Sequence, residues 1–475
     1  MPSYSYERLS AQDNSFLLFE TNNLPMHVAS TQIFELGPLE TKDGGVDYAE
    51  IKRFIGSVLH RISRCRQVLR PIPLEGTPVW VDDEHFELDY HVRHTSLPRP
   101  GSAAQLRALA ARVMAQRLDR ARPLWEIWVV EGLENGRFAL INKTHHCMID
   151  GTSGVDLGQI LQSPTPERVI HEAPAFLPRP APTDTELVFG AVRRRLAMPL
   201  RAARGLRSFR RETEDLWSEL SVRARALRDM VASQTAGVSA TPINARVGPH
   251  RIFDWLSTPL SDVKAIRRAL GCTVNDVVLT VVTGAFREFL LRRSVRPEEI
   301  EFRVQAPVSV RRDEERGQLG NRISAWLLRL PLEEKDPLRQ LAAIHETTRE
   351  LKESQQALGV EMMMQVMDVI PSALLSLGAR AATSGMNSIV TNVPGPQFPL
   401  YLLGAEMLEM YPQVPLFENI GLGIALVSYN GRVCWGFNAD RELVPDLASF
   451  VADIEASLRR VADAAEVKLG SSPEV

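Results

Sequence analysis

Apolar and polar residues recur along the chain at two periods, which predicts short strands interleaved with amphipathic helices. In the first part of the chain, the strand-like runs and helical stripes fall at residues 26–34, 47–69, 86–92, 102–118, 127–130 and 137–143. Asn135-Gly136 separates the last two runs, and this dipeptide between apolar segments is a strong hairpin signal. Strands separated by helices predict an α/β layered domain over roughly the first 160 residues.

A second α/β pattern begins near Thr241. Its clearest helix follows Thr273, which precedes Asp276 at the spacing of a capping box, and its wide apolar stripe indicates a core-facing helix. Further strand-like or helical runs occupy residues 302–310, 323–330, 336–358, 362–377, 388–396, 422–429, 433–438 and 446–462. The pattern therefore predicts a second lobe of the same layered kind.

The two patterns are joined by a segment of different composition. Residues 163–185 contain repeated prolines, which exclude a helix interior or a central strand and indicate a linker. Leu187 to Arg211 then carries eight arginines and no acid, interleaved with apolar residues. This stretch either lies on an anionic lipid surface or is a solvated surface helix. We predict lobes over residues 1–162 and 241–475, with a crossover over 163–240.

Composition limits the class of protein. The 475 residues are 44% hydrophobic and 24% charged, which is typical of a globular chain with two domains or three. The net charge of −3 gives no reason to expect a nucleic-acid partner. The four cysteines are widely spaced, without a CxxC or zinc-type cluster, so we expect reduced thiols and no metal site. No apolar run approaches the roughly 18 residues of a spanning helix, and the first residues lack a signal-peptide pattern.

The strongest chemical candidate is the stretch from Thr144 to Gly151, in which His145-His146 precedes Asp150-Gly151. A strand-like run precedes it, and a possible helix start follows. A histidine at such a corner sits on a rigid element and suits a general base, because its unperturbed pKa of about 6.5 lies near cellular pH. Two alternatives stay open: the histidines form a capping or metal-binding pair, or Cys147 beside them is a nucleophile.

These residues resemble the bacterial wax ester synthase/diacylglycerol acyltransferases, colinearly over nearly the whole chain. The HHxxxDG stretch is shared with the wider acyl-CoA-dependent acyltransferase superfamily, and other blocks narrow the resemblance. Those blocks are Leu9–Leu17 with Pro25-Met26-His27-Val28, Pro123-Leu124-Trp125-Glu126, Val274-Asn275-Asp276-Val277-Val278, Pro307-Val308-Ser309-Val310-Arg311, Gly320-Asn321-Arg322 and Asn392-Val393-Pro394-Gly395-Pro396. Thr391 stands where serine is common in the family.

The resemblance implies an α/β fold of two chloramphenicol-acetyltransferase-like sandwich lobes with a tunnel between them. Acyl-CoA would be a co-substrate, with no other cofactor, and a fatty alcohol or diacylglycerol would accept the acyl group. His146 would act as general base, with His145 orienting it and Asp150 holding the corner. The remaining residues expected at the substrate are Gly151, Asn275, Asp276, Pro123, Leu124, Trp125, Thr391 and Asn392.

The chain has no GxSxG elbow, so direct attack of the alcohol in a ternary complex is favoured over a covalent serine intermediate. We expect a cytoplasmic protein peripheral to the inner membrane or to lipid inclusions. The alternatives are an acyltransferase that takes its acyl group from a carrier-protein thioester, and a non-catalytic protein that coats lipid inclusions. Acceptor preference, acyl chain length and oligomeric state do not follow from these motifs.

Overall fold

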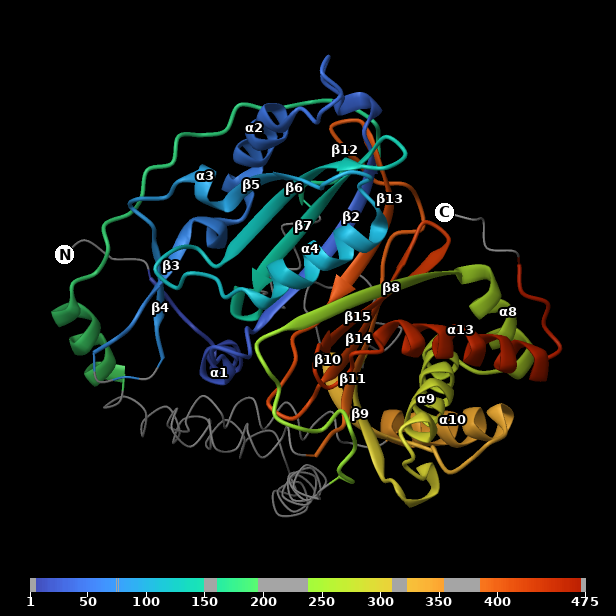
Figure 1. Cartoon of the computed structure of the whole chain (residues 1–475). Helices are drawn as coiled ribbons and strands as arrows, with labels where there is room; N and C mark the ends of the chain where they lie inside the picture. Colours follow the sequence, from blue (N-terminus) through green and yellow to red (C-terminus); the bar gives the residue numbers. More distant parts are fainter. Residues whose placement is uncertain are drawn as a thin grey trace, which may run out of the picture.

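The computed structural model has two lobes, each built around a six-stranded sheet (Figure 1). It describes residues 6–73, 75, 77–148, 160–194, 238–309, 323–353 and 385–470. The first lobe is drawn mainly in blue and cyan, and the second mainly in yellow to red. Layered α/β lobes are what the alternation of strand and helix periods predicts.

The sheet of the first lobe has the order β12-β13-β2-β7-β6-β5. Its strands are β12 (Tyr401–Leu402), β13 (Ala405–Gln413), β2 (His27–Glu35), β7 (Arg137–His145), β6 (Trp125–Leu133) and β5 (Val92–Ser96). Successive β7 residues face opposite sides. Phe138 and Leu140 share a core with α2 (Tyr48–Val58), whereas Ala139 and Ile141 share one with α4 (Ala103–Ala115). The two helices therefore cover opposite faces.

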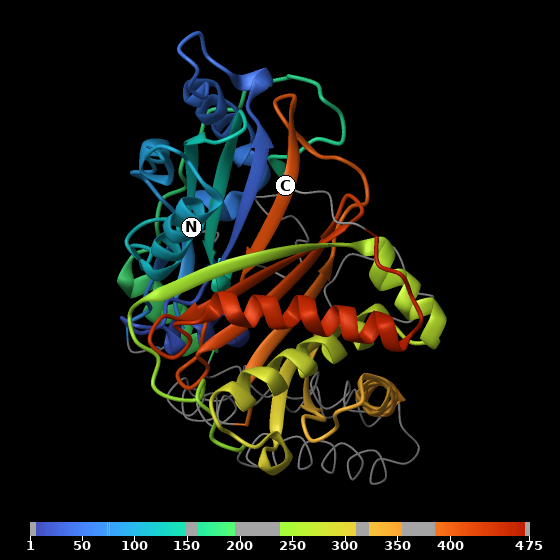
Figure 2. The same ribbon diagram turned by 45° about the vertical axis from the view of Figure 1, so that its right-hand side comes forward.

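The sheet of the second lobe has the order β10-β9-β11-β14-β15-β8. Its strands are β8 (Arg251–Pro259), β9 (Phe302–Ser309), β10 (Ile323–Leu330), β11 (Ser388–Pro394), β14 (Leu422–Tyr429) and β15 (Arg432–Asp440). Four helices pack together beside this sheet (Figure 2): α8 (Leu260–Leu270), α9 (Val274–Arg292), α10 (Pro337–Glu353) and α13 (Leu447–Ala464). Helix α9 is buried along most of its length, as its wide apolar stripe predicted.

Two local predictions, the Asn135-Gly136 hairpin and the capping box of Thr273 with Asp276, are confirmed by backbone geometry, and two further sites show the same kinds of geometry. Asn135 and Gly136 have φ of 64° and 62° in the β6–β7 hairpin, and Asn430-Gly431 joins β14 to β15 in the same way. The capping box of Thr273 with Asp276 starts α9, and Ser10 caps helix α1 (Ala11–Phe19). These signals are short-range, so neighbouring residues decide them.

Two predicted elements are wrong in extent or type. The helix expected over residues 47–69 ends at Val58 and is followed by short 3-10 turns and β3 (Gln67–Arg70), which pairs with β4 (Val79–Asp82). The strand expected over residues 86–92 begins instead with one helical turn, α3 (Leu88–His91). That turn places the buried His91 ring on Trp125, where Nδ1 donates to the Trp125 carbonyl over 2.8 Å. Tertiary contacts override the local period at both sites.

Strand β13 was not predicted at all, and it joins the two halves of the chain. It follows β11 in sequence but pairs antiparallel with β2, so it belongs to the sheet of the first lobe. In Figure 2 the orange β13 runs beside the blue β2. The predicted lobe boundaries at residues 162 and 241 therefore stay a prediction. They do not coincide with the division between the two sheets, because the first sheet includes β13.

The crossover is described as far as Arg194. Residues 184–194 are helical and pack on a small sheet of β1 (Glu7–Arg8), β4 and β3. Leu187 and Ala191 of this segment are buried against that sheet. Phe189 and Val192 of this segment are exposed. Residues 195–211, the larger part of the arginine-rich stretch, lie outside the described residues, as does the helix expected at 362–377.

Among the described helices, none alone is long and apolar enough to span a membrane, and only α8 and α9 together, bent by 101°, meet that test. The four cysteines are free and buried.

Candidate active site

The paired histidines lie where β7 ends. His145 is the last residue of the strand, and His146 begins a 3-10 turn of three residues. His145 pairs in register with His27 of β2, and the His146 N–H donates to the Met26 carbonyl over 2.8 Å. Adjacent residues at a strand end project to opposite faces, so the two rings have different surroundings.

His145 belongs to a buried cluster with Glu20 and His27. The Glu20 carboxylate oxygen Oε1 lies 3.4 Å from His27 Nε2 and 3.6 Å from His145 Nε2. Its second oxygen, Oε2, pairs with Arg117 at 3.1 Å and with Arg120 at 2.7 Å. Burial raises the pKa of Glu20, but hydrogen bonds and charges of the two histidines outweigh it and hold that pKa well below its usual range. The cluster therefore carries a buried carboxylate.

Glu20, His27 and His145 have the donor set and spacing of a metal site, with ligand atoms within 4.8 Å of one another. Two arginines on the same carboxylate add positive charge beside any cation, which argues against a metal. The Cys147 N–H donates to His145 Nδ1 over 3.1 Å, which leaves Nε2 to face Glu20. The arrangement fits a buried electrostatic cluster that fixes the corner beneath His146.

The His146 ring is half-buried and stacks on Phe16 of α1, with ring centroids 3.8 Å apart. Burial lowers its pKa to about 4. Its Nδ1 atom is buried without a hydrogen-bond partner among the described residues. The lowered pKa favours a neutral imidazole near pH 7, and its Nδ1 is unpaired among the described residues.

A cavity of about 590 Å³ lies between the lobes. The first lobe contributes residues of β2, β7 and β13, and the second contributes residues of β11 and β14. Asn142 and Thr144 of β7 line it, and these residues alternate along the strand toward His146. His146 itself is not among the described lining residues. The cavity lies where the expected tunnel would run.

The remaining predicted residues separate into groups. Thr391 lines the cavity, whereas Asn392 and Asn275 do not. Leu124 and Trp125 are fully buried, and the Trp125 indole donates to the Cys65 carbonyl over 2.8 Å. Neither they nor the buried Pro123 line the cavity, so they support β7 from the core. Asp150 and Gly151 lie outside the described residues.

Asp276 is fully buried and fully engaged at the start of α9. Its carboxylate accepts from the Thr273 N–H, from His345 Nδ1 over 2.8 Å and from the Thr348 hydroxyl over 2.9 Å. Burial raises its pKa, but these hydrogen bonds outweigh that effect and lower the pKa overall. The geometry ties α9 to α10 and offers no free oxygen to a substrate.

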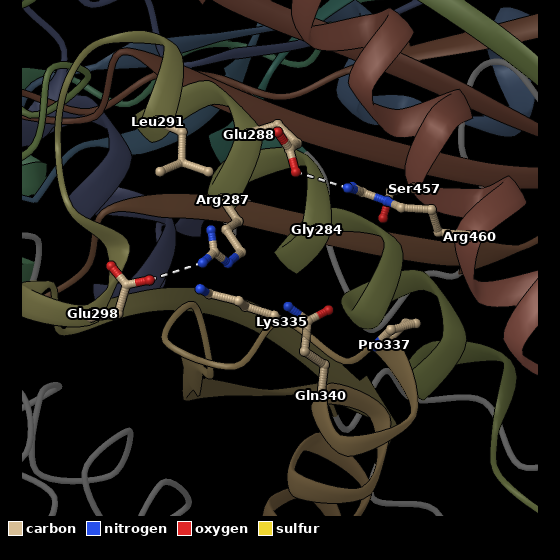
Figure 3. Close-up of a pocket in the computed structure, with 10 residues that line it drawn as sticks. All are labelled: Gly284, Arg287, Glu288, Leu291, Glu298, Lys335, Pro337, Gln340, Ser457 and Arg460. Atoms are coloured by element: carbon tan, nitrogen blue, oxygen red, sulfur yellow. Dashed lines mark hydrogen bonds and ion pairs between the residues drawn. The ribbon is translucent and has the colours of Figure 1, made fainter.

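A second cavity, of about 440 Å³, lies among α9, α10 and α13 of the second lobe. Figure 3 shows charged side chains around it, with Arg287 paired to Glu298 and Arg460 paired to Glu288. This polar, ion-paired lining contrasts with the cavity between the lobes and does not suit an alkyl chain.

The sequence patterns did not single out Phe16, Glu20 or Asn142, and His27 was named only as part of a family block. The register of His27 with His145 brings Glu20 and the histidines together, and register between distant strands has no local signal. Asn142 could have been noticed as a polar residue within an apolar strand, on the same face as Thr144.

The arrangement of two α/β lobes, each built on a six-stranded sheet, is shared with solved structures. The first condensation domain of the CDA synthetase has the same fold, with a TM-score of 0.57 and 16% identity over 99% of this chain and 100% of that one. The lobes are accordingly chloramphenicol-acetyltransferase-like.

Closer comparison identifies the family. Residues 9–278 match the wax ester synthase/diacylglycerol acyltransferase catalytic domain, and residues 319–462 match the C-terminal domain of the same family. A probable diacylglycerol O-acyltransferase of Mycobacterium tuberculosis H37Rv is 31% identical over 95% of each chain. The wax ester synthase/diacylglycerol acyltransferase of Marinobacter aquaeolei VT8 has a TM-score of 0.68 and 25% identity, covering 97% of this chain and 100% of that one. The chain belongs to this family and is an acyltransferase.

Proposed function

We propose that the protein transfers a fatty acyl group from acyl-CoA to diacylglycerol or a long-chain alcohol, forming triacylglycerol or wax ester. One observation carries the proposal. The neutral His146 directly follows a strand whose residues Asn142 and Thr144 line a cavity between the lobes. An apolar cavity beside a general base suits an acceptor with a long chain and one reactive hydroxyl.

In the proposed step, His146 takes the proton of the acceptor hydroxyl while the oxygen attacks the thioester carbonyl. The tetrahedral intermediate then expels the CoA thiolate, which takes the proton back from the imidazolium. The adjacent Cys147 is a poor nucleophile, because burial raises the pKa of its thiol well above the usual range. Direct transfer in a ternary complex is therefore favoured over a cysteine-bound intermediate.

The cluster below His146 supports this assignment. The buried Glu20 carboxylate faces His145 Nε2, and the Cys147 N–H holds His145 Nδ1. These contacts fix the ring of His145 and the backbone of the corner, so His145 is a positioning residue in the proposal. His146 then reaches the reacting atoms from a rigid strand end.

We also propose peripheral association with a lipid surface. Phe189 and Val192 are exposed at the start of the arginine-rich stretch, with exposed fractions of 70% and 49%. Exposed apolar side chains beside arginines favour binding to anionic lipid. Arg194, however, pairs with Glu75 at 3.1 Å, as a solvated surface helix would allow. Binding to anionic and neutral vesicles decides between these interpretations.

The activity test uses the purified full-length protein with palmitoyl-CoA and either a diacylglycerol or hexadecanol. We expect CoA release that depends on the acceptor, with triacylglycerol or wax ester separated by thin-layer chromatography. Reactions without acceptor measure simple hydrolysis. Transfer only from a carrier-protein thioester, or vesicle binding without ester formation, would contradict the proposal.

A further inference from the structure

The cavity between the lobes contains an unpaired amide. Both side-chain polar atoms of Asn142, Oδ1 and Nδ2, are buried and lack a hydrogen-bond partner among the described residues. A buried amide without partners is destabilising, so such a group points to a ligand or water that completes it. Asn142 is also one of the residues that line the cavity.

Strand pleating places the Asn142 side chain on the cavity side. Asn142 pairs with Ser30, which pairs with Pro412, and all three line the cavity. The next row contains Lys143, Ala29 and Gln413, and the Lys143 ammonium donates to the Val113 carbonyl of α4 on the opposite face. The Gln413 amide is also buried without a partner and also lines the cavity, but its row includes Lys143, which does not. Asn142 is the unpaired amide of the row whose three residues all line the cavity.

The polarity of the described lining favours a lipid as the occupant of the cavity. None of the described lining residues carries a charge, which favours an uncharged chain over the phosphates of CoA. Two of them, Val393 and Phe398, are 54% and 50% exposed and mark an apolar mouth. The hydroxyl-bearing Thr144 and Thr391 lie with Asn142 on the inner strands. A lipid that enters with its polar end first would leave its chains at this mouth.

An acyl acceptor has to enter in this direction, because its hydroxyl must reach the base. A diacylglycerol carries ester carbonyls beside that hydroxyl, whereas a fatty alcohol carries only methylene groups. An amide N–H can donate to an ester carbonyl. We propose that Asn142 is a specificity-determining residue that binds an ester group of diacylglycerol and thereby favours glyceride acceptors. This inference rests on the proposed acyl transfer and on the acceptor entering this cavity.

The test compares two acceptors of the same shape, 1,2-dipalmitoylglycerol and its ether analogue 1,2-di-O-hexadecylglycerol. The ether retains the hydroxyl and the chains but lacks the carbonyls. With the wild-type protein, we expect kcat/KM for the ester to exceed that for the ether by about tenfold, the effect of one lost hydrogen bond to a buried amide. Equal values for the two acceptors would overturn the inference, and this arm needs no variant.

The second arm uses Asn142→Leu, which removes the polar atoms at similar size. We expect it to abolish the preference for the ester over the ether, while kcat/KM for hexadecanol changes less than about threefold. Met410→Leu alters the same cavity without removing a polar group and should keep the ester preference. If Asn142→Leu does not fold, Asn142→Val replaces it, since a β-branched apolar residue suits a strand and also lacks a donor.

The outcomes also separate this inference from the proposed function. A wild-type protein that is inactive with every acceptor would contradict the proposed function. This inference alone would be contradicted if the wild-type protein is active with both glycerides and the Asn142 variants keep its preference for the ester. An equal fall of kcat/KM for hexadecanol and for diacylglycerol in the Asn142 variants would also contradict it, because that pattern indicates general damage to the cavity.

Discussion

At the scale of single residues, His146 and Cys147 are neighbours with different expected roles. His146→Ala removes the proposed general base and should lower kcat by about 10²- to 10⁴-fold. Cys147→Ala is the matched control: it removes a buried thiol and should cost about 1 kcal/mol of stability while leaving kcat within a few-fold. Steady-state CoA release and thermal melts measure both effects. Near-wild-type turnover by His146→Ala would refute its role.

The pH dependence of kcat/KM follows from the lowered pKa of His146. Because burial lowers this pKa to about 4, the imidazole is neutral and active as a base above that pH. We expect a flat profile from pH 8 to pH 5 and a decline only as the pH falls toward 4. An acid limb centred near pH 6.5, measured on protein still folded, would show that the ring is not desolvated.

Folding stability should also depend on pH through His27. Burial lowers the pKa of this ring to about 3, although a hydrogen bond to Glu20 raises it. Between pH 6.5 and pH 3 the unfolded chain therefore binds a proton that the folded chain excludes. This contribution to stability is complete above pH 6.5 and declines as the pH falls through that window. Urea unfolding at pH 7.5 and pH 5 measures this contribution as a difference in the free energy of unfolding. We expect that difference to be smaller in His27→Asn than in the wild-type protein.

At the scale of elements, the start of α9 decides between two roles for Asp276. Asp276→Ala leaves the Thr273 N–H, His345 and Thr348 without their acceptor and should lower the free energy of unfolding by about 3 kcal/mol. Asn275→Ala, one residue earlier and partly exposed, should change it by less than about 0.5 kcal/mol. Lost activity with unchanged stability in Asp276→Ala would instead indicate a substrate contact.

How far the elements could be predicted depends on the range of the interactions that form them. Capping boxes and Asn-Gly hairpins are fixed by residues a few positions apart, and the sequence predicted them. Strand β13 contains Pro412 and the acids Glu406 and Glu409, which weaken its apolar pattern. Glu409 is nevertheless buried and accepts from the Tyr411 hydroxyl over 2.9 Å. A partner inside the fold satisfies it, and no local rule reveals that partner.

The candidate site shows the same limit. The motif located His145 and His146, and Thr391 does line the cavity. Glu20 and Phe16 reach the histidines because α1 packs on the turn after β7, a contact between segments more than a hundred residues apart. Only the folded chain shows which histidine faces Glu20 and which faces Phe16.

At the scale of the whole molecule, β13 makes the first lobe depend on the second. A fragment of residues 1–240 lacks this strand, which leaves the backbone of β2 unpaired along one side. We expect this fragment alone to aggregate or to melt without cooperativity, and to gain a cooperative transition when co-expressed with residues 241–475. Calorimetry of both samples tests this. A soluble 1–240 monomer that melts cooperatively would show that the lobe folds independently.

The same strand limits how the enzyme can load and unload its substrates. Strand β13 is hydrogen-bonded into the sheet of the first lobe and is covalently continuous with the second lobe. The two lobes therefore cannot separate by a hinge motion without breaking the backbone hydrogen bonds between β13 and β2. If the proposed function holds, we expect a bulky ester product to leave lengthwise, past the exposed apolar side chain of Phe398. We expect departure of a three-chain product by that route to be slow, so that product release rather than bond formation limits turnover as acceptors grow larger.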